Sequence, residues 1–370
     1  MANVQAAESP SPERANSSPW LILAVMVVTL FAALTLSLLW PNDRYARYQQ
    51  LSDTLHFRSI WAYERIVFDP APIDIAIIGN SRLRAAVAAP KMQDELSKAL
   101  GREVKVVNLS LPQEGRDAHY AMAKLLFEHR GAVKLVILSA IEEMPRKSHP
   151  AFANIADPID TVTAPVLINP SYGENLAFAA FQQISLTAQS LFPRAFGIRG
   201  FSQEDYLGTD FDTTTSYMSA TGNYVDKDTV YTAKDLRGPA RKRIASITKP
   251  VLPAAFAATE YAVEHTYTRK IAEMARESGA ELGFLYMPVF EHKEPLSQES
   301  FYTGFGPVFT ASCIADRAEM FSDYGHMNHA GALEVTGHLA STLARSGVLQ
   351  DAPGATADAK SARSVHTICP

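Results

Sequence analysis

The stretch IDIAIIGNSRLRAAVAAPKMQDELSKALGREVKVVNLS (73–110) decides the fold class. Its apolar ends are typical of buried strands, and the amphipathic segment between them, 82–100, is typical of a helix. The strands predicted in this way along the chain are 73–80, 103–110, 133–140 and 281–289. Because strands alternate with helices of about a dozen residues, the pattern predicts an α/β fold built from β-α-β units around a parallel sheet.

The helices between and after these strands are predicted around 118–129, 254–278 and 328–347. The alternation fades over about 146–250, which we predict to be an insertion or lid on the α/β core. This segment holds an apolar helix over 174–192 and a polar, aromatic-rich region over 199–232. The aromatic side chains of that region either stack on sugar rings or pack within the lid.

The N-terminal part of the chain has a different character. The sequence WLILAVMVVTLFAALTLSLLW (20–40) holds 21 residues without a charge, and such a helix is about 31 Å long, which matches the hydrocarbon core of a bilayer. Tryptophan at both ends suits the two interfaces. We predict a single-pass membrane anchor here; a cleaved signal peptide and a buried core helix are the competing interpretations.

The predicted organisation therefore has five parts. These are a flexible tail over 1–18, a transmembrane anchor over 19–40, a juxtamembrane segment over 41–70, an α/β domain over 71–348 that contains the insertion, and a disordered tail over 349–370. Arg44 and Arg47 after the anchor place the following domain weakly on the cytoplasmic side, although a long domain translocates regardless of such charges.

Composition excludes several classes of protein. Hydrophobic residues make up 47% and charged residues 20% of the 370 residues, as in an ordinary globular protein. Lys and Arg total 34 against 39 for Asp and Glu, a net charge of −5, which disfavours a nucleic-acid partner. The two cysteines, Cys313 and Cys369, are too few for a disulfide scaffold or a thiolate zinc site.

The first candidate for chemistry is Ser81, in IIGNSRL directly after the first strand. Ligands and reacting groups collect at the carboxyl ends of strands in an open α/β sheet. A serine in this place has its hydroxyl at the edge of a crevice. The alternative is a helix N-cap, which needs no chemistry.

The second candidate is FSDYGHMNHAGA (321–332), ahead of the last helix. Asp323 and His326 are three residues apart, which lets a carboxylate bond one imidazole nitrogen and leave the other as a base. A metal site with His329 is the alternative, but the segment lacks the histidine pair of a zinc-binding helix.

Three other motifs are weaker. Asp117 and His119 either form a second pair near the crevice or belong to a helix N-terminal turn. Glu142 and Glu143 follow a strand end and are typical of a solvated first helical turn. The basic run ARKRI (240–244) either meets an anionic polymer or forms a solvated face.

Together, Gly79-Asn80-Ser81 and Asp323-x-x-His326 resemble the first and last motif blocks of the SGNH (GDSL-like) hydrolase superfamily. Met327-Asn328-x-x-Gly331 is similar to the continuation of the last block, and the resemblance covers about 72–145 and 255–345. It implies a three-layer α/β/α fold, Ser81 as nucleophile, His326 as base and Asp323 as its orienting partner. It implies no metal and no cofactor.

The chain departs from this family at the oxyanion hole. Asn108 fits the second block, but Ser110 stands where a glycine is common, and Gly115 supplies a glycine only at a shifted spacing. The third block, VILSAIEEM, lacks the Gly-x-Asn-Asp pattern. Arg82 is a candidate substitute donor, because loss of one such donor typically costs about 10²–10³ in turnover.

Weakened second and third blocks on a chain with a membrane anchor are similar to one branch of the superfamily. That branch comprises extracytoplasmic proteins of exopolysaccharide (alginate-type) O-acetylation and the teichoic-acid D-alanyl transfer protein. The resemblance implies an extracytoplasmic acyltransferase or esterase acting on a glycan, beside a multi-pass membrane acyltransferase. The competing hypothesis is a catalytically degenerate domain that binds polymer or scaffolds a membrane complex.

Overall fold

The computed structural model describes residues 18–39, 43–140, 143, 146–167, 169–218, 224–226, 228–247, 250–293, 296–349 and 364–369. A six-stranded parallel sheet lies at its centre, in the order β2-β1-β3-β6-β7-β8. Its strands are β1 (Ile75–Ile78), β2 (Val106–Asn108), β3 (Leu135–Ser139), β6 (Glu281–Tyr286), β7 (Val308–Thr310) and β8 (Val365–Thr367). The parallel α/β fold predicted from the sequence is confirmed.

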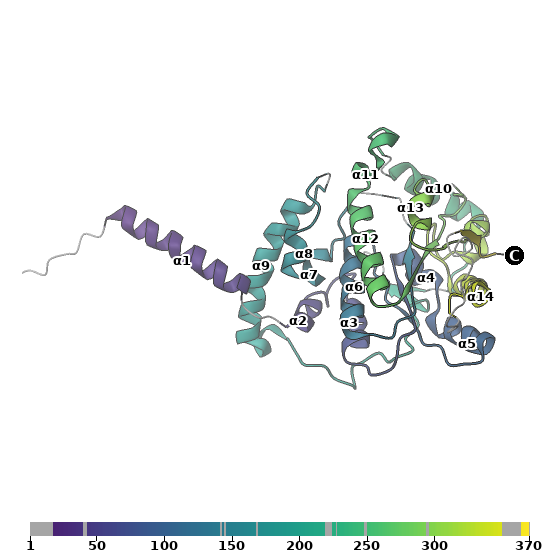
Figure 1. Ribbon diagram of the computed structural model, residues 1–370, viewed down its shortest axis with the longest axis horizontal. Helices are drawn as coiled ribbons and strands as arrows, with labels where there is room; N and C mark the ends of the chain where they lie inside the picture. Colours follow the sequence, from purple (N-terminus) through teal and green to yellow (C-terminus); the bar gives the residue numbers. More distant parts are fainter. Residues whose placement is uncertain are drawn as a thin grey trace, which may run out of the picture.

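Helices cover both faces of this sheet (Figure 1). The helices of the first half are α1 (Pro19–Leu39), α2 (Arg44–Gln49), α3 (Ser59–Val67), α4 (Ser81–Ala86), α5 (Ala89–Leu100), α6 (Arg116–His129), α7 (Phe152–Ile155) and α8 (Pro158–Val162). Those of the second half are α9 (Tyr172–Leu191), α10 (Ala233–Ser246), α11 (Ala257–Glu260), α12 (Ala262–Glu277), α13 (Glu299–Thr303) and α14 (His329–Ser346). A small antiparallel hairpin, β4 (Ser216–Met218) with β5 (Tyr224–Asp226), stands apart from the sheet.

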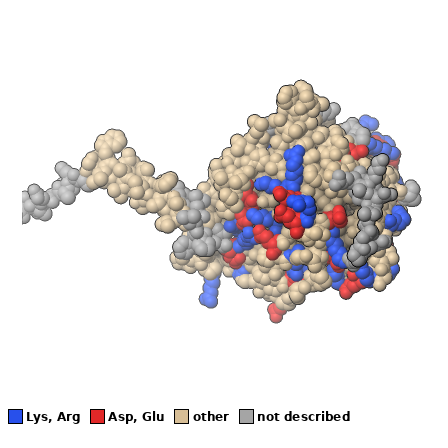
Figure 2. All heavy atoms as spheres, in the orientation of Figure 1, with Lys and Arg blue, Asp and Glu red and all other residues tan. Residues whose placement is uncertain are grey.

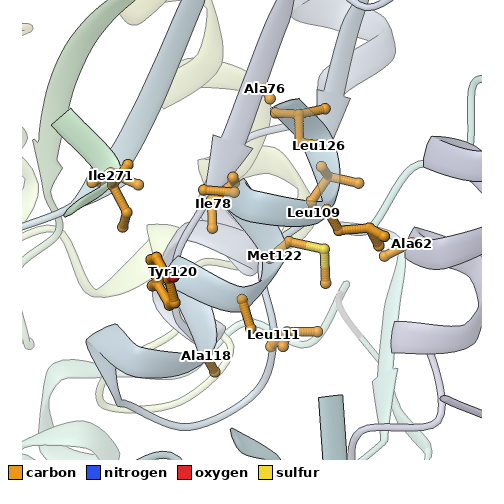
Figure 3. Close-up of a cluster of buried hydrophobic side chains, with 14 of the residues drawn as sticks. Ala62, Ala76, Ile78, Leu109, Leu111, Ala118, Tyr120, Met122, Leu126 and Ile271 are labelled. Carbon is orange, nitrogen blue, oxygen red and sulfur yellow. The ribbon is translucent and has the colours of Figure 1, made fainter. Parts of the chain in front are cut away.

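The period of two along a strand divides the core into two layers. Ala76 and Ile78 of β1 face α6 and α3, where Met122, Leu126 and Ala62 surround them (Figure 3). Ile75 and Ile77 face the opposite layer, which α5 and α14 cover. All four residues of β1 are buried, as expected for a central strand of a parallel sheet.

The helix predicted over 82–100 is two helices. Helix α4 ends at Ala86, and Val87 and Ala88 have extended backbone before α5 begins. Pro90 explains the break, since proline favours the first turn of a helix and disfavours its interior. Ser81 is therefore the first residue of a short helix that is separate from α5.

The segment predicted as juxtamembrane, 41–70, packs into the α/β core. Tyr45 and Tyr48 of α2 and Trp61 and Ile66 of α3 are buried in the same cluster as the first layer of the sheet. Amphipathic spacing in α3 places its apolar residues on one side, so that burial of this side follows from the sequence.

The C-terminal segment corrects a prediction. Sequence analysis places a disordered tail over 349–370, yet residues 364–369 hold β8, which pairs in parallel with β7 at the sheet edge. Cys369 forms a disulfide with Cys313, with 6.2 Å between their Cα atoms. The alternation of Val365, His366 and Thr367 is too short to be recognised as a strand against a polar background.

Helix α1 extends the chain away from the body (Figure 1 and Figure 2). It carries no acidic residue in its first turn and no basic residue in its last, and its described side chains are exposed. Across the described residues, no helix combines the length and hydropathy required for crossing a bilayer. The structure thus gives no support to the transmembrane anchor predicted over 19–40. Nearly all of the tail predicted over 1–18 lies outside the described residues.

Candidate active site

Ser81 lies just after the carboxyl end of β1 and is the first residue of α4. Gly79 lies two residues before it, where a Cβ atom would be 2.7 Å from the Leu83 side chain and 3.0 Å from that of Ser139, so that a larger residue would displace these neighbours. Asn80 caps the helix by accepting hydrogen bonds from the N–H groups of Arg82 (3.1 Å) and Leu83 (3.3 Å). Because Asn80 performs the capping, the Ser81 hydroxyl is left for another partner.

The sheet order explains why this position is a crevice. β1 lies between β2 and β3, so the strand that follows β1 in the chain is its neighbour on one edge, and the next strand, β3, is its neighbour on the other edge. At such a switch point the connections after neighbouring strands diverge and leave an opening at their carboxyl ends.

Asp323 and His326 lie on a tight loop that a β-bridge between Phe321 and Met327 closes. The Asp323 carboxylate accepts hydrogen bonds from the N–H groups of Gly325 (2.8 Å) and His326 (2.9 Å). These bonds fix the loop and hold the carboxylate beside the imidazole of His326.

The residues that follow anchor this loop to α14. Asn328 caps α14 by accepting a hydrogen bond from the Gly331 N–H at 2.8 Å, and it donates to the Glu319 carbonyl at 2.7 Å. A Cβ atom on Gly331 would lie 2.3 Å from the Met320 carbonyl oxygen. The spacing Asn328-x-x-Gly331 thus has a physical reason: Asn328 caps α14, and Gly331 allows the backbone of α14 to approach that of Met320 closely.

The loop brings His326 to Ser81 across the whole sequence. His326 Nε2 lies 2.8 Å from Ser81 Oγ, and His326 Nδ1 lies 2.8 and 2.9 Å from the two oxygens of Asp323. With the imidazole proton on Nδ1, the ring donates to Asp323 and accepts from the serine hydroxyl. This is the geometry of a Ser-His-Asp triad.

The three residues expected to assist the oxyanion have different positions. Asn108 is buried, and its amide donates to the Leu83 and Val87 carbonyls at 3.2 and 2.9 Å, so it holds α4 rather than facing the crevice. Gly115 is the N-cap residue of α6, with φ of +153°, and lies beside the His149 backbone. Arg82 lines the crevice together with Ser81.

The Ser81 backbone N–H is a further donor at this place. Among the hydrogen bonds of the described residues, none takes up this N–H group, since the Asn80 side chain caps the two that follow it. It is therefore available to an oxygen atom bound next to the serine hydroxyl.

A four-charge cluster borders the crevice. Arg82 bonds Glu143 at 2.5 Å, and Arg243 bonds Glu143 at 2.5 Å and Glu114 at 3.0 Å. The two guanidinium groups hold the pKa of Glu143 below its usual range, whereas burial and the neighbouring Glu143 raise that of Glu114. The cavity has a volume of about 210 Å³ and includes Ser81, His326 and three of the cluster's side chains.

Arg243 is a residue that sequence analysis misplaces. The run ARKRI (240–244) was expected to meet polymer or to form a solvated face, yet Arg243 turns from α10 into the crevice. Glu143 is mostly buried in ion pairs rather than solvated, and Glu142 lies outside the described residues. The basic run was a usable signal, but nothing in it shows which arginine points inward.

The other weaker candidates have structural roles. His119 is buried beside Arg116, whose guanidinium donates to its Nδ1 at 3.3 Å. Phe201, Tyr206 and Phe211 of the aromatic-rich segment pack against the first layer of the core, as lid packing requires. His329 contacts Thr214 Oγ1 at 3.2 Å, and the described residues contain no group of three or more metal-ligating side chains.

Asp117 is buried near the start of α6 and holds the backbone of the 148–149 segment. Its carboxylate accepts from the N–H groups of His149 (2.9 Å) and Ala118 (2.9 Å) and from the Ser148 hydroxyl. Burial raises the pKa of Asp117 from its ordinary 3.8 to about 6. The carboxyl therefore takes up a proton in the folded state more readily than in the unfolded chain.

This shift predicts a pH-dependent benefit of Asp117→Asn. The protonated carboxyl stabilises the fold fully below pH 3.8, and this contribution is lost as pH rises through about 6. Asparagine mimics the neutral form at every pH. The stability difference between variant and wild type is expected to change in favour of Asn by up to about 3 kcal/mol from pH 4 to pH 7.

Urea unfolding at several pH values measures this difference. Asp316→Asn, at an exposed carboxyl paired with Lys293, is the matched control and should show no comparable trend. A difference for Asp117→Asn that stays constant with pH would contradict the raised pKa.

Comparison with known proteins identifies no relative of this chain. No protein-family model matches the chain, and no curated protein is similar to it in sequence. What is known of the site therefore comes from its own residues and geometry.

Proposed function

We propose that this chain is a serine acyltransferase or esterase of the SGNH-like type, acting on acetyl or other acyl esters of a cell-surface or secreted polysaccharide. One observation carries the proposal: the hydrogen-bonded series Ser81–His326–Asp323, with 2.8 Å between Ser81 Oγ and His326 Nε2. If Ser81 served only as a helix cap, its hydroxyl would need no contact with an imidazole, and the cap of α4 is already supplied by Asn80.

In the proposed mechanism, His326 Nε2 takes the proton from Ser81 Oγ as the oxygen attacks the acyl carbonyl carbon. Asp323 holds the Nδ1 proton and stabilises the imidazolium that forms. The Ser81 N–H donates to the developing oxyanion, with Arg82 and Gly115 as the other candidate donors. The leaving oxygen then takes the proton from His326, and an acyl-serine remains.

The second half of the reaction decides between transfer and hydrolysis. His326 removes a proton from a sugar hydroxyl or from water, which attacks the acyl-serine and regenerates Ser81. Transfer requires that the sugar hydroxyl displace water. Arg243, which comes from the insertion, narrows the crevice beside Ser81 and supports a role of that segment in covering the site.

We further propose that the catalytic domain is extracytoplasmic and works next to a membrane, beside a multi-pass acyltransferase. The disulfide between Cys313 and Cys369 supports an oxidising compartment. The exposed apolar side chains of α1 support contact with a membrane surface, which does not require that α1 cross the bilayer.

A binding or scaffolding role is the second candidate. The observation that favours it is Asn108, whose amide N–H groups both donate to carbonyls of α4 and its C-cap, together with a third block, VILSAIEEM, that contains no asparagine. Such a domain would bind glycan without acylating Ser81.

Labelling with a serine-directed fluorophosphonate separates the two candidates. The full chain in detergent is treated with the reagent, and mass spectrometry locates the adduct. We expect labelling at Ser81 that is absent in Ser81→Ala and His326→Ala, because only an activated hydroxyl attacks the phosphorus. A folded protein that takes up no label would favour the binding role.

A further inference from the structure

Helix α9 buries two glutamines beside Ala179 and Leu186, while several of its large apolar side chains are exposed. Its inward side chains include Gln182 and Gln183, which are buried, with Gln182 donating to Gln50 Oε1 (3.1 Å) and to the Asn154 carbonyl (3.0 Å). Its outward side chains include Phe181 and Ile184, which are 66% and 46% exposed. A surface helix in water normally turns its large apolar side chains towards the core.

The outward surface continues beyond the helix. We call it the α9 outer face, and it consists of Leu176, Phe181, Ile184, Leu191, Phe192 and Phe196, all exposed. The sequence holds no charged residue between Glu174 and Arg194. Apolar side chains of α8 and the loop after it, over 159–167, extend the same exposed character. A patch of this kind is typical of a binding surface.

Helix α1 indicates what covers this face. It packs against α9 and leaves the body at a steep angle to the α9 axis (Figure 1). It is uncharged from Pro19 to Leu39, and a helix that is apolar on all sides requires apolar surroundings.

We propose that the α9 outer face lies on a lipid bilayer, with α9 parallel to its surface. The apolar side chains then enter the boundary between headgroups and acyl chains, to a depth of about 5–10 Å. The buried glutamines stay within the protein, where their hydrogen bonds are satisfied. This contact fixes the orientation of the α/β domain relative to the membrane, because an extended surface restricts rotation that a single helix such as α1 would allow. The inference goes beyond the proposed function and does not depend on Ser81.

Fluorescence in vesicles tests this orientation. Phe181→Cys and Ile184→Cys variants of the full chain carry an environment-sensitive nitrobenzoxadiazole label, and are reconstituted into phosphatidylethanolamine–phosphatidylglycerol vesicles and isolated by flotation. Ala99→Cys, on the exposed side of α5, is the matched control. We expect emission from 181 and 184 to shift to shorter wavelength, and lipids brominated near the headgroup end of the acyl chain to quench it. The label at 99 should show neither change.

Each other outcome overturns the proposal. Labels at 181 and 184 that behave like the label at 99 place the α9 outer face in water. A shift to shorter wavelength without quenching by brominated lipid shows that protein covers the face, either a second copy or α1 itself. Failure of the chain to float with vesicles excludes a bilayer as the occupant. Fluorophosphonate labelling of the same sample reports on the proposed function separately.

Discussion

Ser81→Ala is expected to lower the turnover of an activated acetyl ester by at least about 10⁴-fold, with little change in the unfolding midpoint. The alanine removes the oxygen that forms the acyl-enzyme, and Ser81 does not supply the cap of α4, which Asn80 provides. His326→Ala should cost about as much, and the double variant no more than either, because residues that act as one unit lose their effect together. Hydrolysis of p-nitrophenyl acetate measures these rates.

Asp323→Asn refines the same experiment. Asparagine keeps one carbonyl oxygen for the N–H groups of Gly325 and His326 but turns an amide N–H towards Nδ1, which favours the wrong tautomer of His326. We expect a loss of about 10²–10⁴-fold. Ser300→Ala, at an exposed serine of α13, is the control. Equal activity of Ser81→Ala and Ser300→Ala would contradict a nucleophilic role for Ser81.

The second large effect concerns stability. Glu264→Ala is expected to destabilise the fold by about 3–5 kcal/mol, because it leaves the Arg116 guanidinium buried without its counter-charge. Arg116 is 2% exposed, and its Nε and Nη2 lie 2.8 and 2.6 Å from the same Glu264 oxygen. Arg116 also donates to the Ser139 carbonyl, and the Tyr302 hydroxyl donates to Glu264 at 3.2 Å. The pair thus joins α6, β3, α12 and α13.

Two further variants separate the cost of an unpaired charge from that of a lost contact. Arg116→Met combined with Glu264→Ala should be less destabilised than Glu264→Ala alone, since no buried cation remains. Asp316→Ala, which removes an exposed ion pair with Lys293, should change stability by less than about 1 kcal/mol. Guanidinium unfolding of all three proteins gives the comparison. A Glu264→Ala effect as small as that of Asp316→Ala would refute the argument.

The sheet follows from local sequence signals, whereas the pairing of Ser81 with His326 is implied by the resemblance of their two motifs to a known family. Buried strands have a strong apolar pattern, and Asp-x-x-His before a helix is a local motif whose partner lies at a strand end. The break at Pro90 is a local signal as well, and sequence analysis overlooks it. Arg243 is of another kind, because the arginine of a basic run that turns inward is decided by how α10 packs.

Helix α9 illustrates the limit of periodicity. Its sequence predicts an apolar helix, and this is confirmed, but the pattern alone indicates that the apolar side faces the core. The buried side holds Gln182 as well as Ala179 and Leu186, and the partners of Gln182, Gln50 and Asn154, come from distant parts of the chain. Long-range polar pairing of this kind is invisible to a single helix's pattern.

The disulfide at the end of the sheet has a consequence for handling the protein. β8 covers the outer edge of β7, and Cys369 fastens that cover to Cys313. If this disulfide were reduced, only the backbone pairing with β7 would keep the three-residue strand β8 at the sheet edge. An uncovered β7 edge presents unpaired N–H and C=O groups, which recruit strands from neighbouring molecules. Protein prepared in a reducing cytosol should therefore tend to self-associate through β7, whereas protein exported to an oxidising space should remain dispersed.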